Sequence, residues 1–352
     1  MKKINGIETV EFLCARFYEK KITIQKSVAN FGLYDYFYCM NLSDFEWLGQ
    51  NIRAEKLLGS DSAVASIFLL REKYGIELSV RDGFLLRRYN GTGSRNGFGF
   101  PLALSENSRL KDALNFLVEK CSAEKTPLRF CLCTRDQKNE IDSCLAENFP
   151  GIKISWNSDH NDSDYIYLAK NLAELPGQKF HKKKNHIARF MRLYENRWEF
   201  KLFPQNDIAD DIIYIEEKWL EEKNSSGGNP DHALVLERQS IASAVEFHSA
   251  LNIRGGVLYV DKSPAAMTLA SPVSPNVLDI HFEKALSGYA TDGAYSVVNN
   301  LFAKESKNFM YLNREEDMGV EGLRKAKLSY KPDIILDKFY GEAEEQPCFQ
   351  KS

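Results

Sequence analysis

Residues 311–332, YLNREEDMGVEGLRKAKLSYKP, predict a short strand followed by a short helix. Alternating apolar and polar residues predict a strand that ends in a run of charged side chains. Gly319 and Gly322 interrupt the extended run, a helix is expected over 323–330, and Pro332 ends that helix. Open α/β sheets usually hold a ligand where a strand ends in this way before a helix. A solvated charged turn is the alternative interpretation.

The length and composition predict a soluble protein with two domains. The chain has 352 residues, of which 43% are hydrophobic and 27% charged, and this length exceeds what one compact core usually serves. The amino terminus lacks the pattern of a signal peptide, and no apolar run approaches the roughly 20 residues that cross a bilayer. A cytoplasmic location is therefore expected. The formal net charge of -3 argues against wholesale wrapping of nucleic acid but permits a local basic patch.

The seven cysteines do not predict a metal site, because they form no CxxC pair and have no regularly spaced histidine partners. Cys131 and Cys133 lie two residues apart on a predicted strand, where buried, reduced thiols are the favoured interpretation. This protein is therefore expected to bind no metal.

Two stretches of similar element order predict a duplicated domain. Residues 1–172 are expected to contain an amphipathic helix at 8–20, further helices, a strand meander and strand–helix–strand units around one mixed sheet. Residues 173–345 repeat this outline and include a strand at 277–285 and the strand and helix of 311–332. The predicted fold class is α/β (α+β), with each mixed sheet flanked by helices.

A helix is predicted at 179–194, KFHKKKNHIARFMRLY, and all of its charged residues are basic. Its apolar residues can lie on one side, which leaves basic side chains facing outward, among them Lys183, Lys184 and Arg189. Repulsion between like charges lowers the stability of such a helix and favours a polyanionic partner. A merely solvated face is the alternative.

The strand VLDIHFEKA places polar residues at alternate positions. The side chains of Asp279, His281 and Glu283 are expected on one face, and those of Ile280 and Phe282 on the other.

The strand that opens 311–332 carries Asn313 and Glu315 on one face. If it neighbours the strand of His281, an imidazole, several carboxylates and an amide converge and could steer an amine nucleophile and shuttle its proton. A surface ion network is the alternative interpretation. Metal binding is a further option that no compact ligand motif supports.

Four segments together resemble a bacterial family related to the C-terminal catalytic domain of phosphatidylglycerol lysyltransferase. They are DYIYLAKNLAELPGQKFHKKKNHIARF, HFEKAL, GAYSVVNNLFAKE and YLNREEDMGVEGLRKAKLSYKP. The resemblance covers most of residues 165–335. It implies two GNAT-like domains in tandem, the architecture of Fem-type peptidoglycan aminoacyltransferases. In those relatives an aminoacyl group passes from charged tRNA to an amine or hydroxyl, at the splayed strands of the second domain.

Transferred to this chain, the resemblance places the site between the strand of His281 and Glu283 and the strand of Asn313 and Glu315. Glu283 or His281 would assist proton removal from the acceptor, and Asn313 would orient the carbonyl group. The donor's phosphates would contact a set of basic residues, namely Arg324, Lys325, Lys327, Lys183, Lys184 and Arg189.

The sequence departs from the resembled proteins in two respects. It lacks a transmembrane region, so a small-molecule or peripheral acceptor is expected. It also lacks an RxxGxG-like pyrophosphate loop, which argues against acetyl-CoA as the donor. No tightly bound cofactor is expected, and the possible donor substrates are aminoacyl-tRNA, with tRNA as a partner, or acyl-CoA. Two alternatives to an aminoacyltransferase remain: a non-catalytic protein that binds RNA or an anionic ligand, and an acyl-CoA-dependent N-acetyltransferase.

Overall fold

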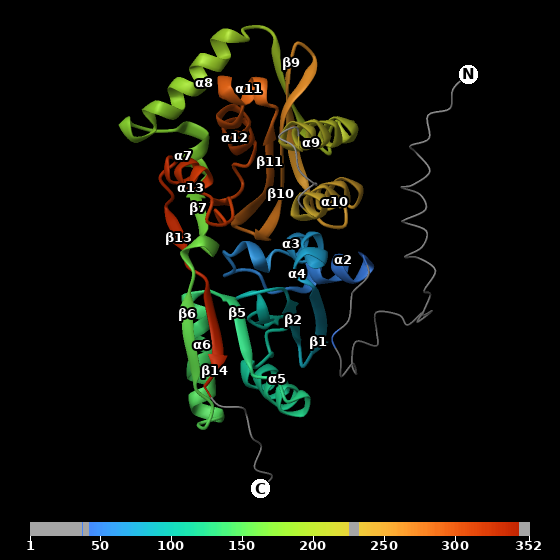
Figure 1. The fold of residues 1–352 in the computed structure, drawn as a ribbon, viewed down its shortest axis with the longest axis vertical. Coiled ribbons are helices and arrows are strands. Elements are labelled where there is room, and N and C mark those ends of the chain that lie inside the picture. Colours follow the sequence, from blue (N-terminus) through green and yellow to red (C-terminus); the bar gives the residue numbers. More distant parts are fainter. Residues whose placement is uncertain (1–36, 38–41, 225–231, 345–352) are drawn as a thin grey trace, which may run out of the picture.

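The computed structural model describes residue 37 and residues 42–224 and 232–344 (Figure 1). The helix expected at 8–20 lies outside these residues. In the described part of the chain, no helix has the length and apolar character needed to span a membrane.

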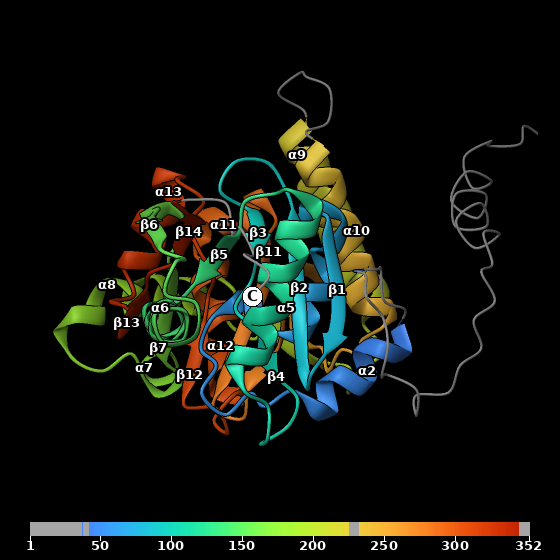
Figure 2. The same ribbon diagram turned by 90° about the horizontal axis from the view of Figure 1, so that it is seen from below.

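The first of two mixed sheets has seven strands and lies in the lower half of Figure 1. Its strand order is β1 (Ile76–Arg81), β2 (Phe84–Asn90), β3 (Asn96–Phe98), β5 (Arg129–Cys133), β14 (Phe339–Ala343) and β6 (Ile154–Ser158), with β4 (Leu102–Ala103) beside β2. Helices α5 (Leu110–Glu124) and α6 (Arg135–Asn148) pack their apolar side chains on the outer face of this sheet (Figure 2).

The second sheet also has seven strands. Their order is β13 (Ile334–Leu336), β7 (Asp164–Leu168), β12 (Tyr311–Asn313), β11 (Val277–Ala285), β10 (Ser263–Ser274), β9 (Arg254–Val260) and β8 (Trp198–Phe203). Helices α9 (Ala209–Asn224) and α10 (His232–Glu246) cover one face (Figure 1). The helices of the other face are α7 (Ala169–Glu174), α8 (His181–Leu193), α11 (Ser287–Asp292) and α12 (Ala294–Glu305).

One hydrophobic core joins the two sheets. Leu78 and Leu85 of the first sheet belong to the same cluster of buried side chains as Val257, Met267 and Phe282 of the second. The short helices α2 (Leu42–Asn51), α3 (Val64–Leu69) and α4 (Arg71–Tyr74) lie between the sheets (Figure 1). A continuous core of this kind holds the halves in one arrangement.

The sheets exchange strands across the expected boundary at residue 172. β7 precedes that boundary but pairs with β12 and β13 in the second sheet, whereas β14, near the end of the chain, lies between β5 and β6 in the first. The division into 1–172 and 173–345 therefore does not coincide with the division between the sheets.

β11 and β12 pair in parallel over only three residues of each strand and then part. The last pair joins Asp279 to Asn313, while β11 continues to Ala285. After β12 the chain runs through a loop into α13 (Glu321–Leu328), so the strand and helix predicted within 311–332 are present. The helix begins and ends two residues earlier than predicted.

A β-bulge at His281 changes which side chains of β11 share a face. The register pairs Ala270 with Ile280 and Leu269 with Phe282, so His281 is an extra residue without a cross-strand partner. As a result, Phe282 packs in the core between the sheets while Ile280 packs on the opposite face. The prediction that Glu283 shares a face with His281 is therefore wrong, because one extra residue inverts the alternation that follows it.

Candidate functional site

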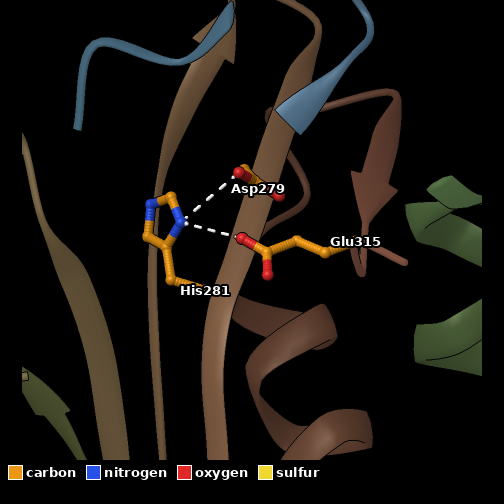
Figure 3. Close-up of side chains that lie close together, drawn as sticks. All are labelled: Asp279, His281 and Glu315. Atoms are coloured by element: carbon orange, nitrogen blue, oxygen red, sulfur yellow. Dashed lines mark hydrogen bonds and ion pairs between the residues drawn. The ribbon is translucent and has the colours of Figure 1, made fainter. Parts of the chain in front are cut away.

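Three side chains meet where β11 and β12 part (Figure 3). The Nδ1 atom of His281 lies 3.3 Å from Oδ2 of Asp279 and 3.3 Å from Oε1 of Glu315. On the other side of the ring, Nε2 lies 2.7 Å from the hydroxyl of Ser271. Two carboxylates facing Nδ1 favour a proton on that atom, and with this tautomer Nε2 accepts a hydrogen bond from the Ser271 hydroxyl. The imidazole is thus fixed from both sides.

Glu315 is held in place by its backbone. Its φ of 55° lies in the left-handed region, and its N–H donates to Oδ1 of Asn313 at 2.8 Å. Its carbonyl oxygen accepts from the backbone N–H of Tyr165 at 3.2 Å. Both partners belong to neighbouring strands of the second sheet, so the sheet determines where the Glu315 carboxyl group points.

Lys327 of α13 binds the same loop. Its ammonium donates to the carbonyl oxygens of Arg314 at 2.5 Å, Glu315 at 3.0 Å and Glu316 at 2.5 Å. An ammonium group has three N–H bonds, and all three are directed at the loop. Lys327 therefore positions Glu315. Its side chain does not point outward, contrary to the prediction that it contacts phosphates.

Burial dominates the electrostatics of this cluster. Desolvation, with the nearby Glu315 carboxylate, raises the pKa of Asp279 well above its ordinary value. Desolvation also raises the pKa of Glu315, while the hydrogen bond from His281 acts in the opposite direction. Carboxyl groups in such surroundings hold their protons to a higher pH than exposed ones, which suits exchange of a proton near neutrality.

Comparison with known proteins identifies the family. The sequence model described as "Phosphatidylglycerol lysyltransferase, C-terminal" matches residues 53–340, which is most of the chain. The chain belongs to the phosphatidylglycerol lysyltransferase C-terminal family. This confirms the resemblance noted from the four sequence segments.

Solved structures with similar folds agree with this family. A conserved protein of unknown function from Bacteroides thetaiotaomicron is 29% identical, with a TM-score of 0.77 over 88% of this chain and 99% of that one. The C-terminal domain of a putative lysylphosphatidylglycerol synthetase from Agrobacterium fabrum is 12% identical, with a TM-score of 0.57 over 86% and 92%. FemX is 9% identical, with a TM-score of 0.52 over 87% and 96%. The latter two likenesses show the shared fold, and the predicted fold class of two mixed sheets flanked by helices is confirmed.

One curated relative is an uncharacterised protein of Mycoplasmoides gallisepticum. It is 22% identical over 214 residues, which are 58% of this chain and 66% of the relative. The match thus spans just under two thirds of that relative's length.

The catalytic residues predicted for this family member divide into two groups. His281 and Glu315 meet as predicted. Glu283 instead lies on the opposite face, where its Oε2 accepts from Nε of Arg314 at 3.0 Å and its Oε1 from Asn299 at 3.2 Å. Both oxygens are occupied, so Glu283 is unsuited to take a proton from an acceptor.

Asn313 is fully buried and has a structural role. Its amide nitrogen donates to the carbonyl of Leu58 at 2.9 Å and to Oδ2 of Asp164 at 2.8 Å, and its oxygen accepts from Glu315. It orients the Glu315 backbone, and its amide is not free to orient a substrate carbonyl.

The predicted phosphate-binding residues also differ in exposure. Lys184 and Arg189 are exposed on α8, although Arg189 lies 3.2 Å from Asp292. Lys325 is exposed and pairs with Glu321 one turn earlier. These three side chains are exposed to solvent, and their contact with phosphates stays a prediction.

Besides Lys327, two further basic residues of the prediction are less exposed or already bound to other groups. Arg324 donates to both carboxylate oxygens of Asp317, at 2.7 and 2.9 Å, and to Asn161 at 2.6 Å. Lys183 is half-buried, with its Nζ 3.9 Å from the centroid of the Tyr330 ring.

The same cluster could hold a divalent cation. One ligand atom from each of Asp279, His281 and Glu315 lies within 4.8 Å of the others, and imidazole and carboxylate are common ligands for such ions. Within the described residues, Oδ1 of Asp279 is buried without a hydrogen-bond partner. The expectation from the sequence that no metal is bound stays a prediction.

Sequence reasoning missed residues that reach the cluster and its adjoining loop from elsewhere in the chain. Ser66 of α3 donates to Oδ2 of Asp279 at 3.1 Å, although it lies 213 positions earlier. Arg95 bonds Glu316 at 2.8 Å and Asp162 at 2.9 Å. No local pattern marks these residues, because only the packing of the first half against the second brings them here.

Proposed function

We propose that this chain transfers an aminoacyl group from aminoacyl-tRNA to an amine or hydroxyl, with Glu315 as the general base. The family is named for lysyl transfer to phosphatidylglycerol, which supports the reaction class. The observation that carries the proposal is the placement of Glu315 against His281 where the strands part. Of the three clustered side chains Glu315 is the most accessible, with 24% exposed against 3% for His281 and none for Asp279.

In this reaction the acceptor nitrogen or oxygen attacks the ester carbonyl of the donor. Glu315 takes the proton that the acceptor loses, the bond between the carbonyl carbon and the tRNA ribose oxygen breaks, and that oxygen receives the proton. The products are the aminoacylated acceptor and tRNA with a free hydroxyl. Because an aminoacyl ester is already activated, positioning and proton transfer suffice as the main catalytic contributions.

His281 and Asp279 act through Glu315 in this proposal. The hydrogen bond from His281 favours the charged form of the carboxyl group, while burial favours the neutral form. These opposed effects leave Glu315 able both to accept a proton and to release it. His281 and Asp279 are therefore positioning residues, and Glu315 is the one that touches the acceptor.

Exposed basic residues support tRNA as the donor. Lys184 and Arg189 on α8 and Lys325 on α13 carry accessible charge on the second half of the molecule. Contacts of this kind displace counterions from the phosphate backbone, so the affinity should fall as salt increases.

The first test is binding of the full chain to charged tRNA, uncharged tRNA and acetyl-CoA, each at two salt concentrations. We expect salt-sensitive binding with a preference for charged tRNA. No tRNA binding at low salt would refute the proposed donor. Binding of acetyl-CoA in that case would favour an acyl-CoA-dependent N-acetyltransferase, and binding of both tRNA forms without turnover would favour a non-catalytic RNA-binding protein.

The second test is Glu315→Gln, assayed as loss of a labelled aminoacyl group from tRNA in the presence of a lipid and metabolite extract. Loss of the base should lower the rate by about 10²–10⁴-fold while tRNA affinity stays unchanged. Glu321→Gln is the matched control, since Glu321 is exposed on α13 and only pairs with Lys325. An unchanged rate in Glu315→Gln would exclude Glu315 as the base.

A further inference from the structure

Asp279, His281 and Glu315, here called the acid–base cluster, lie on one face of the second sheet. The opposite face carries a buried guanidinium with an N–H group that has no acceptor. Arg314 follows β12, and its Nε and Nη2 atoms both donate to the same oxygen of Glu283. Its Nη1 atom is buried and has no hydrogen-bond partner among the described residues. A buried charged donor without a partner is costly, and such groups call for an explanation.

A second cation lies against the same aromatic ring. The Nζ atom of Lys183 is 3.9 Å from the centroid of the Tyr330 ring, and Cζ of Arg314 is 5.0 Å from it. Lys183 is half-buried, and within the described part of the chain no carboxylate accepts a hydrogen bond from its ammonium. Burial and the positive charge of Arg314 lower the pKa of Lys183 to about 8.

The charges in this group do not balance. Arg314 and Lys183 contribute two positive charges, and Glu283 contributes one negative charge. Glu283 already accepts from Arg314 with one oxygen and from Asn299 with the other. One positive charge therefore remains without a counterion in buried surroundings, which disfavour it.

We propose that Arg314 and Lys183 bind a singly charged oxyanion, either a carboxylate or a phosphodiester, over the ring of Tyr330. Nη1 of Arg314 and Nζ of Lys183 would donate to its oxygens. One negative charge balances the group, which disfavours a dianionic phosphate monoester. Because Nη1 is buried, the oxyanion reaches it only after a neighbouring side chain moves, and in this proposal that side chain is the half-buried Lys183.

The position of this group relates it to the acid–base cluster. Arg314 and Glu315 are consecutive residues, and they contact groups on opposite faces of the sheet, Glu283 and His281 respectively. A ligand anchored by its oxyanion on one face could thus extend past the end of β12 towards the other. The binding itself does not depend on the aminoacyl transfer proposed above, and its test uses no turnover.

The test is the rate at which a trace amine-modifying reagent labels each lysine of the full chain at pH 8, measured by mass spectrometry. Dimethyl phosphate and acetate serve as probes, each compared with chloride at equal ionic strength. A bound oxyanion stabilises the charged amine, and a rise of one pKa unit lowers the neutral fraction of Lys183 about fivefold. We expect that decrease at Lys183 and none at Lys179, which also lies near an aromatic ring but is exposed.

The two probes distinguish the source of the oxyanion. Stronger protection by dimethyl phosphate would indicate a nucleic-acid or nucleotide phosphodiester, and stronger protection by acetate would indicate a carboxylate substrate. Absence of protection by both probes at about 100 mM would overturn the proposal, because weak single-anion sites bind in the millimolar range.

Two variants test the assigned residues. Arg314→Lys keeps the charge beside Glu283 but removes Nη1, so protection of Lys183 should disappear. Arg324→Lys is the control, because the guanidinium of Arg324 donates to Asp317 on the same segment. If Arg314→Lys does not fold, Glu283→Gln remains informative: removing the competing negative charge should lower the probe concentration for half-protection severalfold. Protection that survives Arg314→Lys, or that weakens in Glu283→Gln, would contradict the proposal.

Discussion

Asp317 ties the loop after β12 to its surroundings through charged and uncharged donors. It accepts two bonds from Arg324, one from the hydroxyl of Tyr165 at 2.6 Å and one from the N–H of Gly319 at 2.8 Å. These hydrogen bonds favour the charged carboxylate and lower its pKa to about 2 despite desolvation.

We predict a distinct acid dependence of stability from this carboxylate. A folded-state pKa below the unfolded value contributes stability above pH 4, and this contribution is lost as the pH falls through about 2. The melting temperature of the unchanged chain should therefore fall more steeply between pH 4 and pH 2 than that of Asp317→Asn, measured by circular dichroism. Parallel acid profiles for the two proteins would contradict the assignment.

The choice between Glu283 and Glu315 as the base is also decided at the residue scale. The two carboxylates are similar in sequence context, since each lies on or beside a strand of the second sheet. Glu283 has both oxygens occupied by Arg314 and Asn299, whereas Glu315 shares one hydrogen bond with His281 and stays partly accessible. The partners of the oxygens, and not the residue type, distinguish the two roles.

At the scale of elements, α13 fixes the loop between itself and β12. Lys327 binds three consecutive carbonyl oxygens of that loop, from Arg314 to Glu316, and Glu315 holds a left-handed conformation within it. The helix thus acts as a support for the base.

We predict that Lys327→Met lowers the free energy of unfolding by about 2–3 kcal/mol, because three carbonyl oxygens lose a charged donor. Lys325→Met, two residues earlier on the same helix, removes only an exposed pair with Glu321 and should cost no more than about 0.5 kcal/mol. Denaturant titration measures both. Lys327→Met should also slow aminoacyl release without altering tRNA affinity, and rescue by Lys327→Arg would support positioning of the loop. Equal stability losses in the two Met variants would show that the three hydrogen bonds of Lys327 do not stabilise the fold.

The bulge in β11 is the second element that shapes the site. It places His281 beside Asp279 and turns Glu283 to the opposite face, so one strand supplies two of the three clustered side chains and also the counterion of Arg314. A regular strand would have placed all three polar side chains together, as the alternation predicted.

At the scale of the whole molecule, the exchange of strands makes the halves depend on each other. β7 completes the second sheet, and β14 lies between two strands of the first. Lys338 joins the halves further: its ammonium is buried, pairs with Asp61, and lies 3.2 Å from Asp164. Removing either half would expose sheet edges and leave buried charges unpaired.

We predict that residues 1–172 and 173–352 do not fold when produced separately. Neither fragment should show a cooperative thermal transition, whereas co-production should restore a soluble complex that melts as one unit. Circular dichroism of the purified fragments is the measurement. Cooperative folding of the second fragment alone would show that its sheet forms without β7, contrary to this expectation.

The sequence by itself determined the fold class, the family and the elements that carry the site. Alternating residues marked the strands around His281 and Asn313, glycines and a proline bounded the helix after them, and these signals are local. The proximity of His281 and Glu315 was also predicted, on the assumption that their strands are neighbours. The structure confirms that assumption.

Only the tertiary structure decided which of the polar side chains can act. A single extra residue at His281 reversed the face of Glu283, and burial of Asn313 turned a candidate catalytic amide into a backbone support. Ser66 and Lys338 reach the site region from distant parts of the chain, and Lys327 turns inward. Periodicity specifies faces within one element, whereas register shifts and contacts between elements depend on how the whole chain packs.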